Sequence, residues 1–266
     1  MSFSSTLVHR AEIRFHEAAP SLRSLVGSFW VITADRGARI RVVPDGSTAI
    51  STQFPMNEPA GWILRGPLVQ PDERQFCAPA IVVGVRLRPG VAFLLTGTPA
   101  RAIVGRRVTL SDLPAFDELG SGQPSPVAPE RCIDALQRFL IQRLEGAKVH
   151  AVVTSAIHEI EREQGCVRVS ELARRSSVSP RHLNRLMQTW VGYGPKCFAS
   201  VIRFQEALKQ MEHAPGQSGA ALASGTGYFD QSHLTLDVAR FGGATPGHLA
   251  ATCVADFSKT RCLDPP

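Results

Sequence analysis

The chain has 266 residues, of which 44% are hydrophobic and 20% are charged. This composition supplies a folded core, and it excludes a disordered chain, a fibrous chain and a small disulfide scaffold. A net charge of +6 is compatible with a nucleic-acid partner without establishing one. The N-terminal segment has no apolar signal region and no run of about 18 apolar residues follows, so a cytoplasmic protein without a membrane span is expected.

Residues 1–119 show the pattern of short β-strands. Runs rich in β-branched residues occur at Ile40–Val43, Ala80–Leu87 and Ile103–Val104, and turn signals such as Pro44-Asp45-Gly46 separate them. Short strands with turns at this spacing are typical of a barrel or a sandwich. The sequence therefore predicts a β-rich domain that is barrel- or sandwich-like.

The pattern becomes helical after this region. Residues 120–150 are interpreted as a turn-rich linker followed by an amphipathic connecting helix from about Pro129 to Glu145. Its single apolar stripe is expected to pack against its own domain, with a dimer surface as the alternative. Residues 151–252 form an all-α domain and residues 253–266 form a C-terminal tail. The predicted fold class is therefore α+β.

A first helix-turn-helix candidate runs from Val169 to Trp190. Ser170 is a plausible N-cap of its first helix, and Ser179 caps a second helix that has Pro180 at its first position. Arginine and asparagine near the start of a recognition helix are suited to guanine and adenine edges in the major groove. The candidate DNA-binding residues on this helix are Arg181, His182, Asn184 and Arg185.

The positive charge is concentrated around this candidate. Residues 166–203 contain seven basic residues and one acidic residue, a net charge of +6 that equals that of the whole chain. A plain helical hairpin with a solvated face is the alternative, and the charge concentration favours a phosphate-contacting surface. Arg174, Arg175 and Lys196 are therefore added to the candidate DNA-binding residues.

A second candidate runs from Ser218 to Phe241. Gly227 allows a positive φ in its turn, and Asp230 can cap the helix that follows. Residues 218–248 contain one basic and two acidic residues, a net charge of −1 that attracts phosphates poorly. The first candidate is therefore predicted to carry most of the DNA affinity. The candidate DNA-binding residues of the second are Gln231, Ser232, His233, Thr235 and Arg240.

The stretch from about Val152 to Ala251 resembles the DNA-binding domain of the AraC/XylS family of bacterial transcription regulators. The features that carry the resemblance are ELARRSSVSPRHLNRLMQTWVGYGPKCF, the following IRFQEAL, and GYFDQSHL with RFGGATPGHL. The resemblance implies two helix-turn-helix subdomains joined by one long helix, here about Pro195 to Met211. It also implies recognition helices at Ser179–Thr189 and Asp230–Arg240, which enter successive major grooves of double-stranded DNA.

The first half of the chain resembles a β-rich sensing or dimerisation domain that precedes this module in some members. Ser28-Phe29-Trp30, Arg41 to Gly46 and Gly84 to Gly90 carry this likeness. It implies a sequence-specific transcription regulator, with a small-molecule effector, a homodimer and, for an activator, RNA polymerase as further expected partners. Location at the bacterial nucleoid follows from the same resemblance.

Several positions depart from the family pattern, including Gly219, where a large apolar residue is usual. Ser177 stands in the first turn where a glycine is usual, and a serine there is strained if its φ is positive. Leu236 and Ala239 stand where members tend to carry a basic pair. The second recognition helix has therefore lost charges that a typical member would direct at DNA.

The main alternative is a cupin-like enzyme or ligand-binding protein that is tethered to DNA. Only His9 and His16 precede residue 150, and they form no paired metal ligands, so no metal, cofactor or catalytic residue is expected. Arg86 and Arg88 alternate along one strand and are weak candidates for binding an anionic effector. An ordinary solvated face is favoured for them, because charged side chains are seldom buried.

Overall fold

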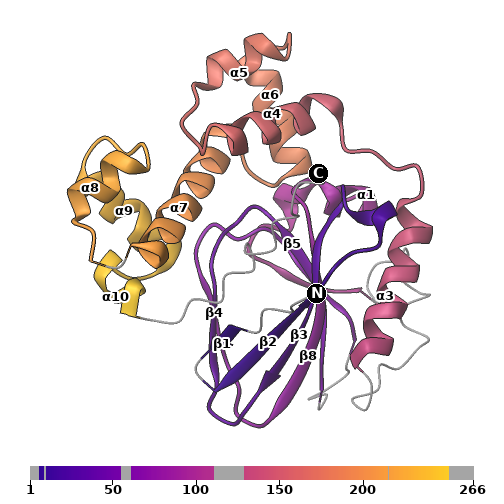
Figure 1. Ribbon diagram of the computed structural model, residues 1–266. Helices are drawn as coiled ribbons and strands as arrows, with labels where there is room; N and C mark the ends of the chain where they lie inside the picture. Colours follow the sequence, from indigo (N-terminus) through magenta and orange to yellow (C-terminus); the bar gives the residue numbers. More distant parts are fainter. Residues whose placement is uncertain (1–5, 9, 55–60, 111–128, 215, 252–266) are drawn as a thin grey trace.

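The computed structural model describes residues 6–8, 10–54, 61–110, 129–214 and 216–251 (Figure 1). Its β-rich part contains a seven-stranded antiparallel sheet in the order β1-β2-β3-β8-β5-β6-β9 and a two-stranded ribbon of β4 and β7. The strands are β1 (Thr6–Val8), β2 (Ala11–His16), β3 (Val26–Ala34), β4 (Arg39–Val42), β5 (Thr48–Phe54), β6 (Ile63–Arg65), β7 (Asp72–Gln75), β8 (Ala80–Leu87) and β9 (Arg107–Thr109).

Both faces of the large sheet are covered, and short helical turns connect its strands. On one face the ribbon packs Ile40 and Phe76 against Trp30, Ile32 and Val82. On the other face lies helix α3 (Pro129–Leu144), whose apolar stripe joins the core of the sheet. This confirms that the stripe is buried within its own domain. The connecting elements are η1 (Pro20–Leu22), α1 (Val91–Thr96) and η2 (Ala100–Ala102).

The prediction of a strand at Ile103–Val104 is wrong. Ile103 follows η2 and is buried in the core, and the chain then turns at Gly105, which has a φ of 66°. The Gly105 N–H donates to the Pro67 carbonyl at 2.9 Å, so the backbone is committed to a turn. The strand β9 begins two residues later, because only there does the chain run alongside β6.

The helical part follows α3 and surrounds one long helix. Two helix pairs lie near opposite ends of α7, and α4 packs beside the first pair (Figure 1). The α+β fold class and the two helix-turn-helix units are thus confirmed, whereas the predicted boundaries at 119 and 252 lie outside the described residues. The helices are α4 (Ala151–Arg162), α5 (Val169–Arg175), α6 (Pro180–Trp190), α7 (Pro195–His213), α8 (Gly219–Gly225), α9 (Gln231–Gly242) and α10 (Pro246–Ala251).

Side-chain caps fix where the helix-turn-helix helices begin. The Ser179 hydroxyl accepts the His182 N–H at 3.2 Å, and the Asp230 carboxylate accepts the His233 N–H at 2.8 Å, as predicted. Ser170 does not cap α5, because that helix already begins at Val169. The reason is that the Arg168 carbonyl accepts the first helical hydrogen bonds, which places Ser170 inside the first turn. None of the described helices is both long and apolar enough to cross a membrane.

Ser177 has a φ of +54°. From the sequence, this serine is expected to be strained if its φ is positive, and that condition is met. Ser177→Gly is expected to raise the free energy of unfolding by about 0.5–1 kcal/mol, because a left-handed conformation costs a non-glycine residue about 1–2 kcal/mol and glycine's extra freedom in the unfolded chain offsets part of this. Urea unfolding followed by circular dichroism measures the change. Ser176→Gly, at a φ of −88°, is the control and should not stabilise the protein; equal effects would contradict the strain.

The β-rich part holds both ends of the helical part. At the first helix pair, Phe93 of α1 stacks edge-on with Trp190 of α6, with ring centroids 4.7 Å apart. In the middle, the buried Gln205 side chain of α7 donates to the Pro44 carbonyl at 2.6 Å. At the second pair, the Arg41 guanidinium donates to the carbonyl of Gly242 in α9 at 3.3 Å.

Candidate nucleic-acid interface

The first turns of α6 form an exposed basic surface. Arg181 and Arg185 are exposed, whereas Leu183 and Met187 of the same helix are fully buried. Because Trp190 holds the far end of α6 against α1, the free end is the one that begins at the Ser179 cap. A recognition helix presents this same end to the floor of a major groove.

The candidate DNA-binding side chains on α6 differ in their surroundings. No ion pair involves Arg181 within the described ranges, so its guanidinium projects from the helix without an internal partner. Arg185 lies 3.1 Å from the Nδ1 atom of the half-buried His182. The Asn184 carboxamide lies against Gly194, where a Cβ atom would overlap its oxygen. Arg181 and Arg185 are thus the side chains best placed for base or phosphate contacts.

Two other predicted contacts, Arg174 and Arg175, belong to an ion-pair cluster on α5. The Glu171 carboxylate accepts hydrogen bonds from Arg174 at 2.7 Å and from Arg175 at 2.9 Å, and Arg175 also pairs with Glu159 of α4. Hydrogen bonding from Arg174 and then Arg175 lowers the pKa of Glu171 to about 2, so the cluster stays charged from pH 5 to 8. The concentrated positive charge of the sequence is therefore partly neutralised here.

Glu171→Gln is expected to raise the affinity for nonspecific duplex DNA by about three- to tenfold at low salt, because it releases Arg174 from its only carboxylate partner among the described residues and weakens the hold on Arg175. The gain should shrink as salt is raised. Fluorescence anisotropy at two salt concentrations measures it. Glu163→Gln is the control, since Glu163 pairs with Arg162. An unchanged affinity and salt slope would show that α5 does not face DNA.

Several polar side chains of α9 make contacts within the protein. His233 is half-buried, stacks edge-on against Tyr228 at 5.1 Å and lies 3.9 Å from Asp237. The Thr235 hydroxyl donates to the Gln231 carbonyl at 2.8 Å, and the Arg240 guanidinium lies 4.8 Å from the Phe241 ring centroid. Gln231 and Ser232 are exposed, and Lys196 is exposed on α7.

Two large apolar side chains, one on the outer face of α9 and one in the turn before it, are exposed although the sequence did not single them out. Phe229 is 92% exposed and Leu236 is 71% exposed. The sequence had identified Leu236 only as a lost positive charge. The signal that could have found this face is the helical spacing of 236 and 239, which lie opposite the buried positions Leu234, Val238 and Phe241.

Comparison with known families agrees with this architecture. Residues 172–252 match the family described as "Helix-turn-helix domain", and residues 14–109 match the family described as "Domain of unknown function (DUF6597)". The chain carries an AraC-type helix-turn-helix domain. Domains of this type belong to DNA-binding transcription regulators. No curated protein matches the sequence.

Several solved structures are similar to this chain. A probable AraC family transcriptional regulator from Rhodopseudomonas palustris CGA009 is 22% identical, covers 38% of this chain and 96% of its own, and has a TM-score of 0.36. The C-terminal domain of AraT from Geobacillus stearothermophilus is 19% identical, covers 41% and 90%, and scores 0.37. ToxT from Vibrio cholerae is 10% identical, covers 84% and 97%, and scores 0.45.

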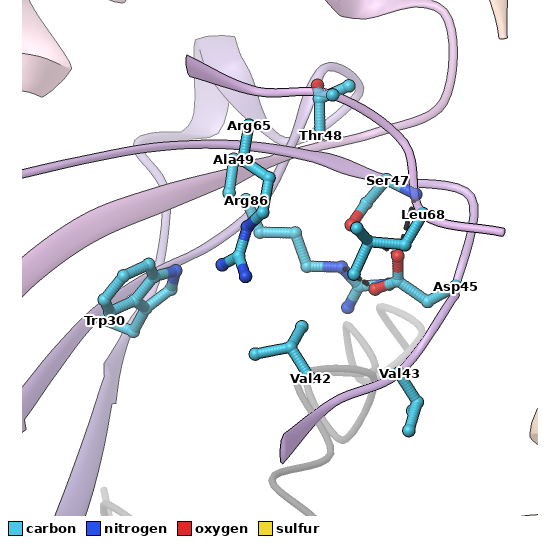
Figure 2. Close-up of a pocket in the computed structure, with 11 residues that line it drawn as sticks. Trp30, Val42, Val43, Asp45, Ser47, Thr48, Ala49, Arg65, Leu68 and Arg86 are labelled. Atoms are coloured by element: carbon cyan, nitrogen blue, oxygen red, sulfur yellow. Dashed lines mark hydrogen bonds and ion pairs between the residues drawn. The ribbon is translucent and has the colours of Figure 1, made fainter. Parts of the chain in front are cut away.

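A small hollow opens on the β-rich part (Figure 2). Arg86 lines it and pairs with Asp45, with 3.0 Å between Nε and Oδ2. The other oxygen of Asp45 accepts hydrogen bonds from the Ser47 backbone at 2.8 Å and hydroxyl at 2.6 Å. The lining residues are Trp30, Val42, Val43, Asp45, Ser47, Thr48, Ala49, Arg65, Gly66, Leu68 and Arg86.

The two arginines proposed from the sequence do not act as a pair. Strand β8 ends at Leu87, and Arg88 beyond it donates to the Arg23 carbonyl at 3.0 Å, outside the hollow. The second cation in the hollow is Arg65 of β6, which pairs with Asp72 at 3.0 Å. Burial lowers the pKa of Arg65, against the opposing effect of Asp72. No alternation within one strand could reveal Arg65, because β6 reaches the hollow through the sheet order.

Proposed function

We propose that this chain is a sequence-specific DNA-binding transcription regulator in which the α5–α6 unit supplies most of the affinity. The observation that carries the proposal is the exposed start of α6, where Arg181 and Arg185 project beside the Ser179 cap. The DNA target of such a regulator is the bacterial chromosome, which lies in the cytoplasm. Contact of this chain with RNA polymerase and its assembly into a homodimer remain predictions from the sequence.

The test is to map the genomic binding sites of the intact chain and of a chain that lacks residues 152–252. Discrete sites for the intact chain that disappear with the deletion would support a regulator. Uniform binding along DNA, or sites that persist in the deleted chain, would overturn it. Purified intact protein should then bind the recovered sites more tightly than scrambled duplexes of the same composition.

We further propose that a small anionic ligand in the hollow adjusts how the helical part engages DNA. A carboxylate or phosphate would compete with Asp45 for Arg86, because both groups present oxygens to one guanidinium. Asp45 lies between Pro44, whose carbonyl binds Gln205 of α7, and Gly46, which lies under the Phe198 ring. Movement of Asp45 would therefore shift the two neighbouring residues that contact α7.

The ligand proposal is tested by thermal unfolding and DNA titration in the presence of acetate or inorganic phosphate. A rise in Tm and a change in DNA affinity that both disappear in Arg86→Gln would support it. Arg88→Gln is the matched control, because Arg88 is on the same chain segment and outside the hollow. Equal responses of the wild type and Arg86→Gln would overturn it.

A further inference from the structure

The outer face of α9 differs in chemistry from the outer face of α6, although the two helices are built alike. Counting from the cap, Arg181 and Arg185 are the second and sixth residues of α6 after Ser179. The same positions after Asp230 in α9 are Ser232 and Leu236. Leu236 therefore stands where the first unit presents its second exposed arginine.

The turn before α9 carries a second exposed apolar group. Three residues (176–178) separate α5 from Ser179, whereas four (226–229) separate α8 from Asp230. The last of the four is Phe229, which is 92% exposed and precedes the N-cap of α9. Within the helix, Leu236 and Ala239 are three residues apart, so they lie on the same side of α9.

These side chains contribute little to the core of the second unit. Leu234, Val238 and Phe241 are fully buried and supply its packing, whereas Leu236 is 71% exposed. Scattered exposed apolar residues are ordinary, but Leu236 and Ala239 lie on the outer face of a helix whose counterpart in the first unit is basic.

We propose that α9 reads the 5-methyl groups of thymine in the major groove through Leu236 and Ala239, with Phe229 exposed in the turn that precedes the helix. This rests on the proposed function. The thymine methyl is the apolar group that a base pair presents in the major groove, and apolar side chains contact it. Because residues 218–248 carry a net charge of −1, the contact contributes discrimination between sequences while α6 contributes the phosphate-driven affinity.

The experiment starts from the tightest duplex that the full-length protein selects from a random pool. Deoxyuridine then replaces thymine in the half that faces α9, which removes the methyl groups and keeps base pairing. Affinity is expected to fall about three- to fivefold for each methyl that Leu236 contacts. The same replacement in the half that faces α6 should have no effect.

Leu236→Ala should bind the thymine duplex as weakly as the wild type binds the deoxyuridine duplex, and should no longer distinguish the two. Its Tm should be unchanged, since the side chain is 71% exposed. Ile141→Ala, which trims another exposed apolar residue on α3, is the matched control and should keep the full response to deoxyuridine.

Each other outcome overturns the inference. A selected half-site without thymine, or equal affinity for the two duplexes, would do so while leaving DNA binding intact. Loss of self-association in Leu236→Ala without a deoxyuridine effect would assign the face to a second copy of the chain instead. Failure of the pool to yield any preferred sequence would contradict the proposed function itself, which is a distinguishable result.

Discussion

Replacing Arg181 and Arg185 together by alanine is expected to lower affinity for the target duplex by at least about thirtyfold. Each side chain is exposed at the free end of α6, and one arginine contact to a guanine edge contributes about 1–3 kcal/mol. If both contact phosphates instead, the slope of log affinity against log salt should fall by about 2. A titration by fluorescence anisotropy at several salt concentrations measures both quantities.

The matched control replaces His233 and Arg240 of α9 by alanine. Less than about a fivefold loss is expected, because the His233 ring packs against Tyr228 and the Arg240 guanidinium stacks on Phe241. Equal losses from the two double variants would contradict a dominant first unit. Circular dichroism of all variants confirms that they are folded before affinities are compared.

Gly46→Ala is expected to lower the free energy of unfolding by about 2–4 kcal/mol. Gly46 has a φ of +81°, where a non-glycine residue is strained by about 1–2 kcal/mol. A Cβ atom would also overlap the Phe198 ring of α7 and lie 3.4 Å from the Tyr193 hydroxyl, and overpacking a buried contact adds about 1–3 kcal/mol. Urea unfolding of the full chain measures the loss.

Gly97→Ala separates the two causes, since Gly97 has a φ of +64° with no atom within 4 Å of an added Cβ. It should show the backbone strain alone. Phe198→Leu, placed in the Gly46→Ala background, should recover part of the packing cost in a double-mutant cycle. Equal destabilisation by Gly46→Ala and Gly97→Ala would mean that Gly46 is not packed closely against Phe198 of α7.

Features set by neighbours in sequence were predictable, and those set by neighbours in space were not. Ser179, Asp230 and Gly227 act within one turn of the chain, so their roles followed from residue type alone. The strand Ala80–Leu87 was correct to the residue, because a long β-branched run fits a buried central strand. Ile103 and Val104 are also β-branched, but the adjacent turn at Gly105 prevents them from forming a strand.

The candidate sites show the same division. The basic start of α6 follows from sequence, but the charge count around it missed Glu159, which reaches Arg175 from α4 across sixteen residues of chain. Arg65 was missed for the same reason, since sheet order brings β6 beside the hollow. The buried side of α9 was predicted correctly as Leu234, Val238 and Phe241, but the exposed apolar Leu236 opposite it was interpreted only as a lost charge.

The β-rich part contacts both ends of the helical part, and these contacts bear on the spacing between the half-sites of an operator. Helix α7 has 19 residues and spans about 28 Å, which is about 6–8 Å shorter than the 34–36 Å of one DNA turn. Trp190 is held against α1 at one end, and the Gly242 carbonyl accepts from Arg41 at the other. One extra base pair between half-sites rotates them by about 35°, since a turn holds about 10–10.5 base pairs. If both units engage DNA at once, we therefore expect operators with one base pair more or fewer between the half-sites to bind more weakly.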